Sequence, residues 1–339
     1  MNRGRQSGSE PSTLVIGEAL TDLLTGPDGR STAVPGGSPA NVALGLARLG
    51  HPVRLATRVG GDVYGLALRR HLGGSGVRLT DGSVVDAATS TATAVLDADG
   101  AASYRFDITW SLPPEASDPA TTGPVAHLHT GSIAALLAPG AAQVVAAVRA
   151  AQPGATVSYD PNLRPALLGP AAQERPRVEE LVALSDVVKA SEEDLGWLYP
   201  GHDTAAVAAR WARSGPSLVV LTLGAGGALA FWRHGSHQVR PTPVEVVDTV
   251  GAGDAFMAGL LSGLLAAGLL GGGQGGRALA RAELRAATSA QRLPATAVDS
   301  LTLAARTAAL TCTRPGADPP RRAEVLEYWP NGTNGGTGQ

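Results

Sequence analysis

The sequence predicts an α/β fold in which a mostly parallel β-sheet is covered by helices on both faces. Short runs rich in β-branched and other apolar residues alternate with alanine-rich runs of helical character, which is the order expected of repeated βα units. The chain has 339 residues and is 44% hydrophobic. It therefore has enough apolar surface for a large buried core, in one large domain or two modest ones.

The elements of this core are identified from their apolar runs. The predicted strands lie at residues 14–16, 53–57, 125–129, 156–159, 187–189 and 218–222. Helices are predicted between them, for example at 42–49 and 141–150. The longest apolar run, 257–270, is interrupted by glycine and serine and is shorter than the roughly 20 residues that a membrane span needs. We therefore expect it to be a buried helix.

One region departs from the alternating pattern. Residues 92–105 contain two β-prone stretches on either side of Asp-Ala-Asp-Gly at 97–100, which is a hairpin signal. A hairpin joins antiparallel strands, so these residues do not belong to an all-parallel sheet.

A glycine-rich turn followed by an apolar helix is the most informative local pattern. Gly251 and Gly253 allow a tight turn and close approach to a ligand, and the first N–H groups of the following helix have no partner within that helix. Such a turn binds anions well. Asp254 lies at the junction and is predicted to accept a proton from an attacking hydroxyl, with the amides holding a phosphoryl group. The alternative is that Asp254 stabilises only the helix start, by about 0.3–1 kcal/mol.

A second glycine cluster, Gly-Gly-Ser-Pro-Ala-Asn at residues 36–41, also opens a predicted helix. Its side-chain amide, on Asn41, is suited to binding sugar hydroxyls. Asn is also a preferred helix-capping residue, so a purely structural role for Asn41 is the alternative.

Composition limits the other functions. A formal net charge of −2 argues against nucleic-acid binding, which requires a basic surface. The single cysteine, Cys312, rules out internal disulfides and Cys-x-x-Cys sites and fits a reducing cytoplasm. Residues 1–11 lack the apolar run of a secretory signal. We expect residues 1–11 and 330–339 to be disordered tails and 271–276 to be a flexible loop.

The two glycine clusters, about two hundred residues apart, resemble the paired signatures of the ribokinase-like carbohydrate kinase family. Further runs resemble family landmarks in the expected order, namely those at residues 14–22, 58–65, 160–165, 222–227 and 309–318. Within the family, bacterial fructokinases are most closely resembled by four motifs: Gly-Glu-Ala-Leu at 17–20, Gly-Gly-Ser-Pro-Ala-Asn at 36–41, Asp-Pro-Asn-Leu-Arg at 160–164 and the Thr-Cys-x-Arg-x-Gly-Ala ending.

The resemblance implies a three-layer sandwich with a small β lid and a function for each motif. The kinase domain would span residues 12–329, with lid segments at about 20–34 and 90–110. Asp254 would be the general base, and the amides of Gly251, Ala252 and Gly253 would stabilise the transferred phosphoryl group. The expected sugar-binding residues are Asp22, Gly37, Asn41, Arg105 and Arg164. The structural alternative for Asp22 is that it is a turn residue. For Arg105 it is that the side chain is a solvated charge on the hairpin.

No Walker-type phosphate loop is present, so the nucleotide site is also assigned by resemblance. It comprises Ser191, Thr222, Gly224 and Gly227. The carboxylate that orients the waters of Mg²⁺ is either Glu193 or Asp194, because Ser191 and Asp194 replace the family's Asn and Glu. A K⁺ site would lie beside the anion-binding turn, at Asp248, Val250, Arg314 and Gly316, although Pro319-Pro320 departs from the small polar residue found in ribokinase.

These observations favour an ATP-dependent sugar kinase of the cytoplasm, with a sugar and ATP as its small-molecule partners and fructose as the expected substrate. A kinase for 2-keto-3-deoxygluconate is the main alternative, which requires that both Arg105 and Arg164 point into the pocket. Ribose and nucleosides are further alternatives, and a non-catalytic sugar sensor is disfavoured by the intact Asp254 turn. Pairing of lid strands in a homodimer is left open, and no membrane partner is expected.

Overall fold

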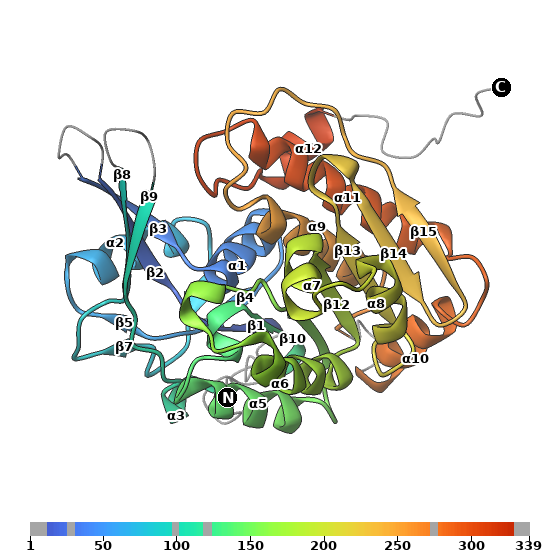
Figure 1. The fold of residues 1–339 in the computed structure, drawn as a ribbon, viewed down its shortest axis with the longest axis horizontal. Coiled ribbons are helices and arrows are strands. Elements are labelled where there is room, and N and C mark those ends of the chain that lie inside the picture. The colour runs from blue at the N-terminus through green and yellow to red at the C-terminus, as the bar shows by residue number, and fades with distance from the viewer. Residues whose placement is uncertain (1–11, 26–30, 97–101, 118–123, 272–276, 329–339) are drawn as a thin grey trace, which may run out of the picture.

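A nine-stranded, mostly parallel sheet forms the centre of the computed structural model (Figure 1). The structure describes residues 12–25, 31–96, 102–117, 124–271 and 277–328. The strand order is β15-β14-β13-β12-β11-β10-β1-β4-β6, and only the pairs that involve β14 are antiparallel. In chain order the strands are β1 (Ser12–Ile16), β4 (Val53–Ala56), β6 (Arg78–Leu79), β10 (Val125–Gly131), β11 (Thr156–Asp160), β12 (Val187–Ser191), β13 (Leu218–Thr222), β14 (Ala228–Trp232) and β15 (Gly235–Val239).

All six predicted core strands are confirmed, with small differences at their ends. They are buried along nearly their whole length, as expected of parallel strands that are covered on both faces. The antiparallel extension formed by β14 and β15 was not predicted. The burial of β15 alternates between inward and outward residues, which is the pattern of a strand with one solvated face rather than of a core strand.

Helices cover both faces of the sheet, and two separate hydrophobic clusters form between the layers. On one face lie α1 (Ser38–Arg48), α2 (Val63–Gly73), α9 (Ala252–Ala266), α10 (Arg277–Ala287) and α11 (Ala295–Cys312). On the other face lie α5 (Gly140–Ala151), α6 (Ala171–Leu184), α7 (Glu192–Leu198) and α8 (Thr204–Trp211). The remaining short elements are α3 (Pro114–Ser117), α12 (Arg322–Tyr328), and the 3₁₀ turns η1 (Ser132–Ala135), η2 (Pro165–Leu167) and η3 (Gly224–Gly226).

The apolar run at 257–270 forms most of α9, a buried helix as predicted, although the helix begins at Ala252 and ends at Ala266. It packs closely against α1 and α11. A Cβ atom on Gly263 would lie 2.6 Å from the Cα of Ser300, which is too close for any side chain. The small residues that interrupt the apolar run therefore allow close helix packing and hold the start of α9 in place.

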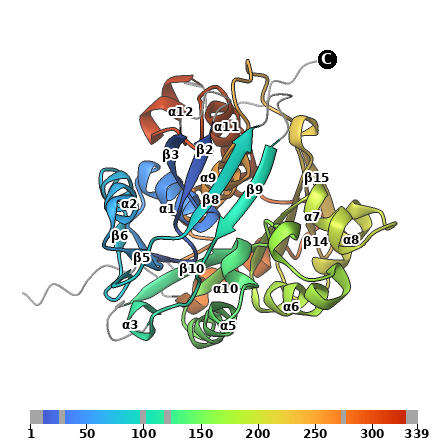
Figure 2. The same cartoon turned by 60° about the vertical axis from the view of Figure 1, so that its left-hand side comes forward.

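A second sheet of four strands lies beside the main one, with the order β3-β2-β8-β9 (Figure 1). It contains β2 (Leu20–Thr25), β3 (Ser31–Gly36), β8 (Thr91–Leu96) and β9 (Ala102–Asp107). The predicted hairpin is confirmed, because β8 and β9 are antiparallel, but its turn at 97–100 lies outside the described residues. Figure 2 shows β8 and β9 as two broad, adjacent arrows in the foreground. A further pair of short strands, β5 (Val59–Gly60) and β7 (Val84–Val85), is parallel.

Most of the segments expected to be flexible lie outside the described residues, namely 1–11, 272–276 and 330–339. Within the described part of the chain, none of the helices combines the length and apolar character that a bilayer span requires.

Candidate active site

The turn before α9 presents unpaired backbone N–H groups. Gly251 is the N-cap of α9 and has φ 75°, and a Cβ atom there would lie 2.5 Å from the Cβ of Ala317, so both conformation and space require glycine. The N–H of Ala252 donates to the carbonyl of Thr249. Within the described residues, the N–H groups of Gly251 and Gly253 have no internal acceptor. These two amides are therefore available to an anion.

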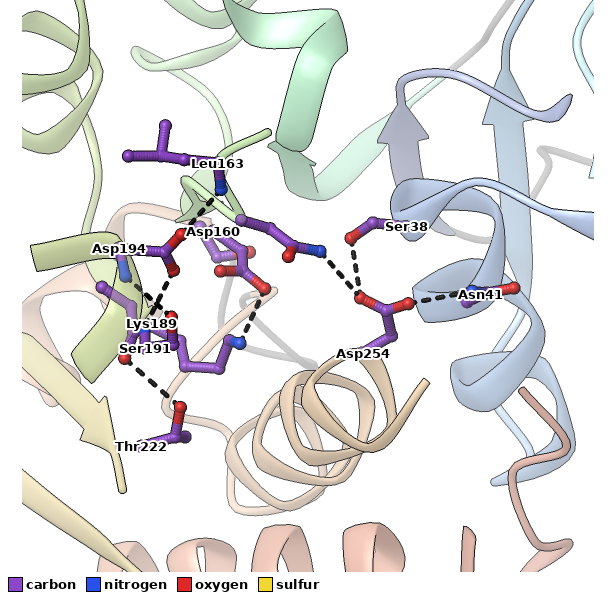
Figure 3. A network of polar contacts seen from close by, with 12 residues as sticks. Ser38, Asn41, Asp160, Leu163, Lys189, Ser191, Asp194, Thr222 and Asp254 are labelled. Atoms are coloured by element: carbon purple, nitrogen blue, oxygen red, sulfur yellow. Dashed lines mark hydrogen bonds and ion pairs between the residues drawn. The ribbon is translucent and has the colours of Figure 1, made fainter. Parts of the chain in front are cut away.

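Asp254, in the first turn of α9, is held by three side chains from two other segments (Figure 3). Its Oδ1 accepts hydrogen bonds from Ser38 Oγ at 2.7 Å and Asn162 Nδ2 at 3.3 Å. Its Oδ2 accepts one from Asn41 Nδ2 at 2.9 Å. Ser38 and Asn41 lie in the first turns of α1, so the two glycine clusters of the sequence meet at this carboxylate. Oδ2 keeps a lone pair with no donor among these side chains.

Burial raises the pKa of Asp254 above its ordinary value, and the hydrogen bonds from Ser38 and Asn41 oppose that rise. Lys189 and Arg164 oppose it further through their charges. A carboxylate with a raised pKa is a stronger proton acceptor than a solvated one, which suits a general base.

A buried ion pair lies next to this turn. Lys189 Nζ is 3.0 Å from Asp160 Oδ2, and both side chains are almost completely buried. A Cβ atom on Gly253 would lie 3.1 Å from Lys189 Nζ, so the ammonium group adjoins the start of α9. Burial acts to lower the pKa of Lys189, but the nearby carboxylates, chiefly Asp160, raise it above its ordinary value. The ammonium therefore adds positive charge beside the free amides.

Asp22 and Arg164 are the other two charged candidates near Asp254, and the charge of Arg164 acts on both carboxyl groups. Asp22 is on β2, and its Oδ2 lies so close to Gly36 that a Cβ atom there would be 2.1 Å away. Burial raises the pKa of Asp22 to about 6, while the charge of Arg164 opposes the rise. Arg164 Nη1 donates to both oxygens of Asn162 and to the carbonyl of Leu163. Gly37, with φ 102°, is the N-cap of α1.

The structure does not bring Arg105 to this group. In the small sheet, Asp22 is paired in register with Ala92, and Ala92 with Phe106. Arg105 is paired instead with Thr93. Since paired residues share a face and successive residues alternate between faces, Phe106 shares the face of Asp22, whereas the exposed Arg105 lies on the opposite face. Arg105 and Phe106 are adjacent in β9, so their side chains lie on opposite faces of the small sheet.

The predicted nucleotide residues lie at the ends of β12 and β13. Thr222 ends β13 and donates to the carbonyl of Ala190 at 3.4 Å. Gly224 and Gly227 have φ 53° and 84°; Gly224 is the first residue of the exposed 3₁₀ turn η3, and Gly227 follows its last residue. Ser191 ends β12, which pairs with β13 in parallel. These residues therefore lie at neighbouring strand ends, where ligands of open α/β sheets bind.

Asp194 and Glu193, the two candidates for orienting Mg²⁺, differ sharply. Asp194 forms a capping box with Ser191 at the start of α7, and its Oδ1 accepts a hydrogen bond from the N–H of Leu163 at 2.7 Å. Both of its oxygens thus accept backbone N–H groups. Glu193 is exposed. Among the described residues, no group of three or more His, Cys, Asp or Glu side chains is arranged to hold a metal ion directly.

The four residues expected at a K⁺ site lie in two segments that Asp248 joins. Asp248 Oδ2 accepts a hydrogen bond from the N–H of Gly316 at 2.7 Å, and its Oδ1 accepts one from the N–H of Val250. Arg314 pairs with Glu324 and Asp318. These contacts hold the two backbone segments together next to the turn before α9.

A comparison with protein-family models identifies the family. The model described as "pfkB family carbohydrate kinase" matches residues 12–323, which is almost the whole described chain. The protein belongs to the pfkB family of carbohydrate kinases. Its similarity to individual members agrees with this. A fructokinase from Klebsiella pneumoniae is 38% identical over 257 residues, which cover 74% of this chain and 83% of that protein.

Solved structures of pfkB-family kinases share the same fold. A fructokinase from Xylella fastidiosa with bound ATP superposes with a TM-score of 0.78 at 29% identity, covering 93% of this chain and 97% of that chain. A fructokinase from Vibrio cholerae O395 with fructose, ADP and calcium bound has a TM-score of 0.70 at 29% identity, covering 94% and 99%.

Sequence reasoning missed several side chains of this pfkB-family site. Ser38, Asp160 and Asn162 lie within runs that resemble family landmarks, and Lys189 ends a predicted strand, but none of the four was assigned a role. One signal was available for Lys189, which is a charged residue in an otherwise apolar strand. The contacts of Ser38 and Asn162 with Asp254 join residues 216 and 92 positions apart, so only the folded chain reveals them.

Proposed function

We propose that this protein is an ATP-dependent fructokinase that transfers the γ-phosphoryl group of ATP to a hydroxyl of fructose, giving fructose 6-phosphate and ADP. The observation that carries the proposal is the position of Asp254, a buried carboxylate with three side-chain donors beside two free amides. The fructokinases named above support fructose as the acceptor.

Asp254 is proposed as the general base, with Oδ2 as the accepting atom. Oδ1 already accepts two hydrogen bonds and Oδ2 only one, so Oδ2 has the lone pair that faces an incoming hydroxyl. As the sugar oxygen forms its bond to the γ-phosphorus, the bond from that phosphorus to the β–γ bridging oxygen breaks and ADP leaves. The hydroxyl proton passes to Oδ2. Such proton transfer is worth about 10²–10⁴-fold in rate.

The charge on the transferred phosphoryl group is proposed to be stabilised at the start of α9. The N–H groups of Gly251 and Gly253 and the ammonium of Lys189 converge there. Ala252 contributes mainly backbone geometry, because its N–H already has an acceptor. Preorganised donors of this kind act most strongly in a site that excludes water.

Mg²⁺ and K⁺ are proposed as the metal ions of the site, and the oxygen donors of this chain fit both. Mg²⁺ would enter with ATP, neutralise charge on its phosphates and keep most of its hydration shell. Of the two candidate carboxylates, Glu193 has open lone pairs, whereas those of Asp194 face backbone donors. For K⁺, the backbone carbonyls of Val250, Arg314 and Gly316 fit, in the two segments that Asp248 joins.

We propose a neutral sugar rather than a sugar acid as the acceptor. Asp22 is suited to pair with sugar hydroxyls, and Asn41 keeps its Oδ1 as an acceptor because its Nδ2 donates to Asp254. Phe106, rather than Arg105, shares the face of Asp22. The sugar-acid alternative requires that both Arg105 and Arg164 point into the site. Of these two, Arg164 is the one whose charge acts on Asp22 and Asp254. We propose that the reaction takes place in the cytoplasm, where ATP is available.

A substrate panel tests the proposal. ADP release is measured with Mg-ATP and K⁺ against fructose, ribose, 2-keto-3-deoxygluconate and adenosine, with Asp254→Asn as the matched control. We expect the largest kcat/KM for fructose and loss of turnover in the variant. A preference for the sugar acid would overturn the substrate, and binding of sugars without any turnover would favour a sensor instead.

A further inference from the structure

Asn162, which follows β11, has an unusual backbone conformation. Its φ is +37°, in the left-handed region that disfavours most side chains but that Asn tolerates. Together with Ser132 it is one of two non-glycine residues with positive φ in the described part of the chain. The side chain of Asn162 lies next to that of Arg164, two residues further along the chain.

The side-chain amide of Asn162 contacts a different charged group at each end. Its Nδ2 donates to Asp254 Oδ1 at 3.3 Å, and its Oδ1 accepts from Arg164 Nη1 at 2.7 Å. The same guanidinium nitrogen donates to the Asn162 backbone carbonyl at 2.9 Å. A guanidinium only donates and a carboxylate only accepts, so the two neighbours fix the orientation of the amide.

We propose that Asn162 is a positioning residue that joins the general base Asp254 to Arg164 through its side-chain amide. The inference rests on the proposed kinase function, since it gives Asp254 its role. Occupation of Oδ1 by Asn162 and Ser38 leaves Oδ2 to face the sugar hydroxyl. The same amide, with two backbone carbonyls, holds Arg164 beside Asp22 and Asp254.

The bridge also has an electrostatic effect. A cation bound to the amide oxygen polarises the amide, so its N–H becomes a better donor to the carboxylate. A donor to the ionised form of a carboxyl favours that form. Ser38, Asn41 and Lys189 act on Asp254 in the same direction, and the charge of Asp160 opposes them. Removing the amide should therefore make Asp254 harder to ionise.

Two substitutions separate the side chain from the backbone. Asn162→Gly keeps access to positive φ but removes the amide, and Asn162→Asp keeps the shape and the tolerance for positive φ but replaces the donor with a carboxylate. For Asn162→Gly we expect kcat to fall about tenfold while KM for the sugar changes less than about threefold. The acidic limb of kcat/KM should move up by about half a pH unit or more, and further in Asn162→Asp.

A double-mutant cycle tests the link to Arg164. Arg164→Ala lowers kcat by some factor in the wild type. In the Asn162→Gly background that factor should be smaller by about threefold or more, because the bridge is already broken. Additive effects, or a wild-type acidic limb in Asn162→Gly, would overturn the bridge. A purely structural role would lower stability without moving that limb.

A second readout is independent of turnover. The carboxyl carbon of Asp254 is titrated by ¹³C NMR, with the signal assigned by its loss in Asp254→Asn. A higher pKa in Asn162→Gly than in the wild type supports the bridge, and an unchanged pKa contradicts it. If the wild type phosphorylates none of the sugars, the proposed function fails, and this titration still decides the bridge.

Discussion

Two aspartates occupy the same position in two helices and are used in opposite ways. Asp254 and Asp194 are each the third residue of their helix, α9 and α7, and each is 6% exposed. Both oxygens of Asp194 accept backbone N–H groups. Among the residues that the structure describes, the oxygens of Asp254 accept hydrogen bonds only from side chains of other segments.

The N-cap residue explains the difference. Ser191, the N-cap of α7, has extended backbone angles and completes a capping box with Asp194. The N-cap of α9 is Gly251, which is left-handed and has no side chain to cap with. A capping box requires the extended N-cap conformation, so Asp254 is free to face other segments. The glycine that exposes the amides of this turn thereby also frees the carboxylate.

The largest effect is expected from Asp254→Asn. If this carboxylate is the base, kcat should fall by at least about 10²-fold, whereas the affinities for sugar and ATP should change little. The stability of the variant should equal or exceed that of the wild type, because a buried charge is removed. Steady-state ADP release, calorimetric binding and urea denaturation measure these three quantities. Undiminished turnover would remove Asp254 from the mechanism.

Asp194→Ala should produce the reverse pattern. It leaves the buried N–H of Leu163 and that of Ser191 without their acceptors, so the free energy of unfolding should fall by about 3 kcal/mol. Turnover of the folded variant should fall less than about tenfold. Urea denaturation measures this loss. Ser191→Ala is the control for the capping contribution, and its free energy of unfolding should fall by about 1 kcal/mol. A stable but inactive Asp194→Ala would instead make Asp194 part of the Mg²⁺ site.

How far the sequence predicts this pair depends on which contacts are local. The capping box of Asp194 joins residues three apart, so it is a local contact. The resemblance assigns Ser191 to the nucleotide site and Asp194 to the Mg²⁺ site, and neither is predicted as part of a capping box. The glycine turn and Asp254 were predicted from the local pattern alone. The donors to Asp254 come from residues far apart in sequence, and the face of Arg105 depends on strand register, which a one-residue offset reverses. The parallel core was predictable because its strands are continuous apolar runs.

A third buried carboxyl, Glu18, extends the comparison. It is 4% exposed, and its Oε2 accepts a hydrogen bond from the N–H of Ala134. Burial raises its pKa from 4.5 to about 7. Because the folded state then binds the proton more tightly than the unfolded state, the contribution of Glu18 to stability is largest at low pH and falls as pH rises between these two values.

Glu18→Gln tests this effect, because an amide keeps an acceptor for Ala134 and does not ionise. The wild type should lose roughly 1 kcal/mol of stability per pH unit between about pH 5 and 7 through this group. The variant should lack that part of the slope. Urea denaturation at several pH values compares the two proteins, and parallel stability profiles would show that Glu18 ionises normally in the fold.

The smallest effect is expected from Arg105→Ala, and its matched partner is Asp22→Ala in the same sheet. Asp22 faces the site and Arg105 the opposite face. Loss of Asp22 should raise KM for fructose about tenfold, because its bonds to sugar hydroxyls would form in ground and transition states alike. Loss of Arg105 should change KM and kcat less than about twofold. Steady-state kinetics on fructose and on 2-keto-3-deoxygluconate measure both variants. If Arg105→Ala selectively impairs phosphorylation of the sugar acid, the register argument fails and Arg105 reaches the pocket when the small sheet closes.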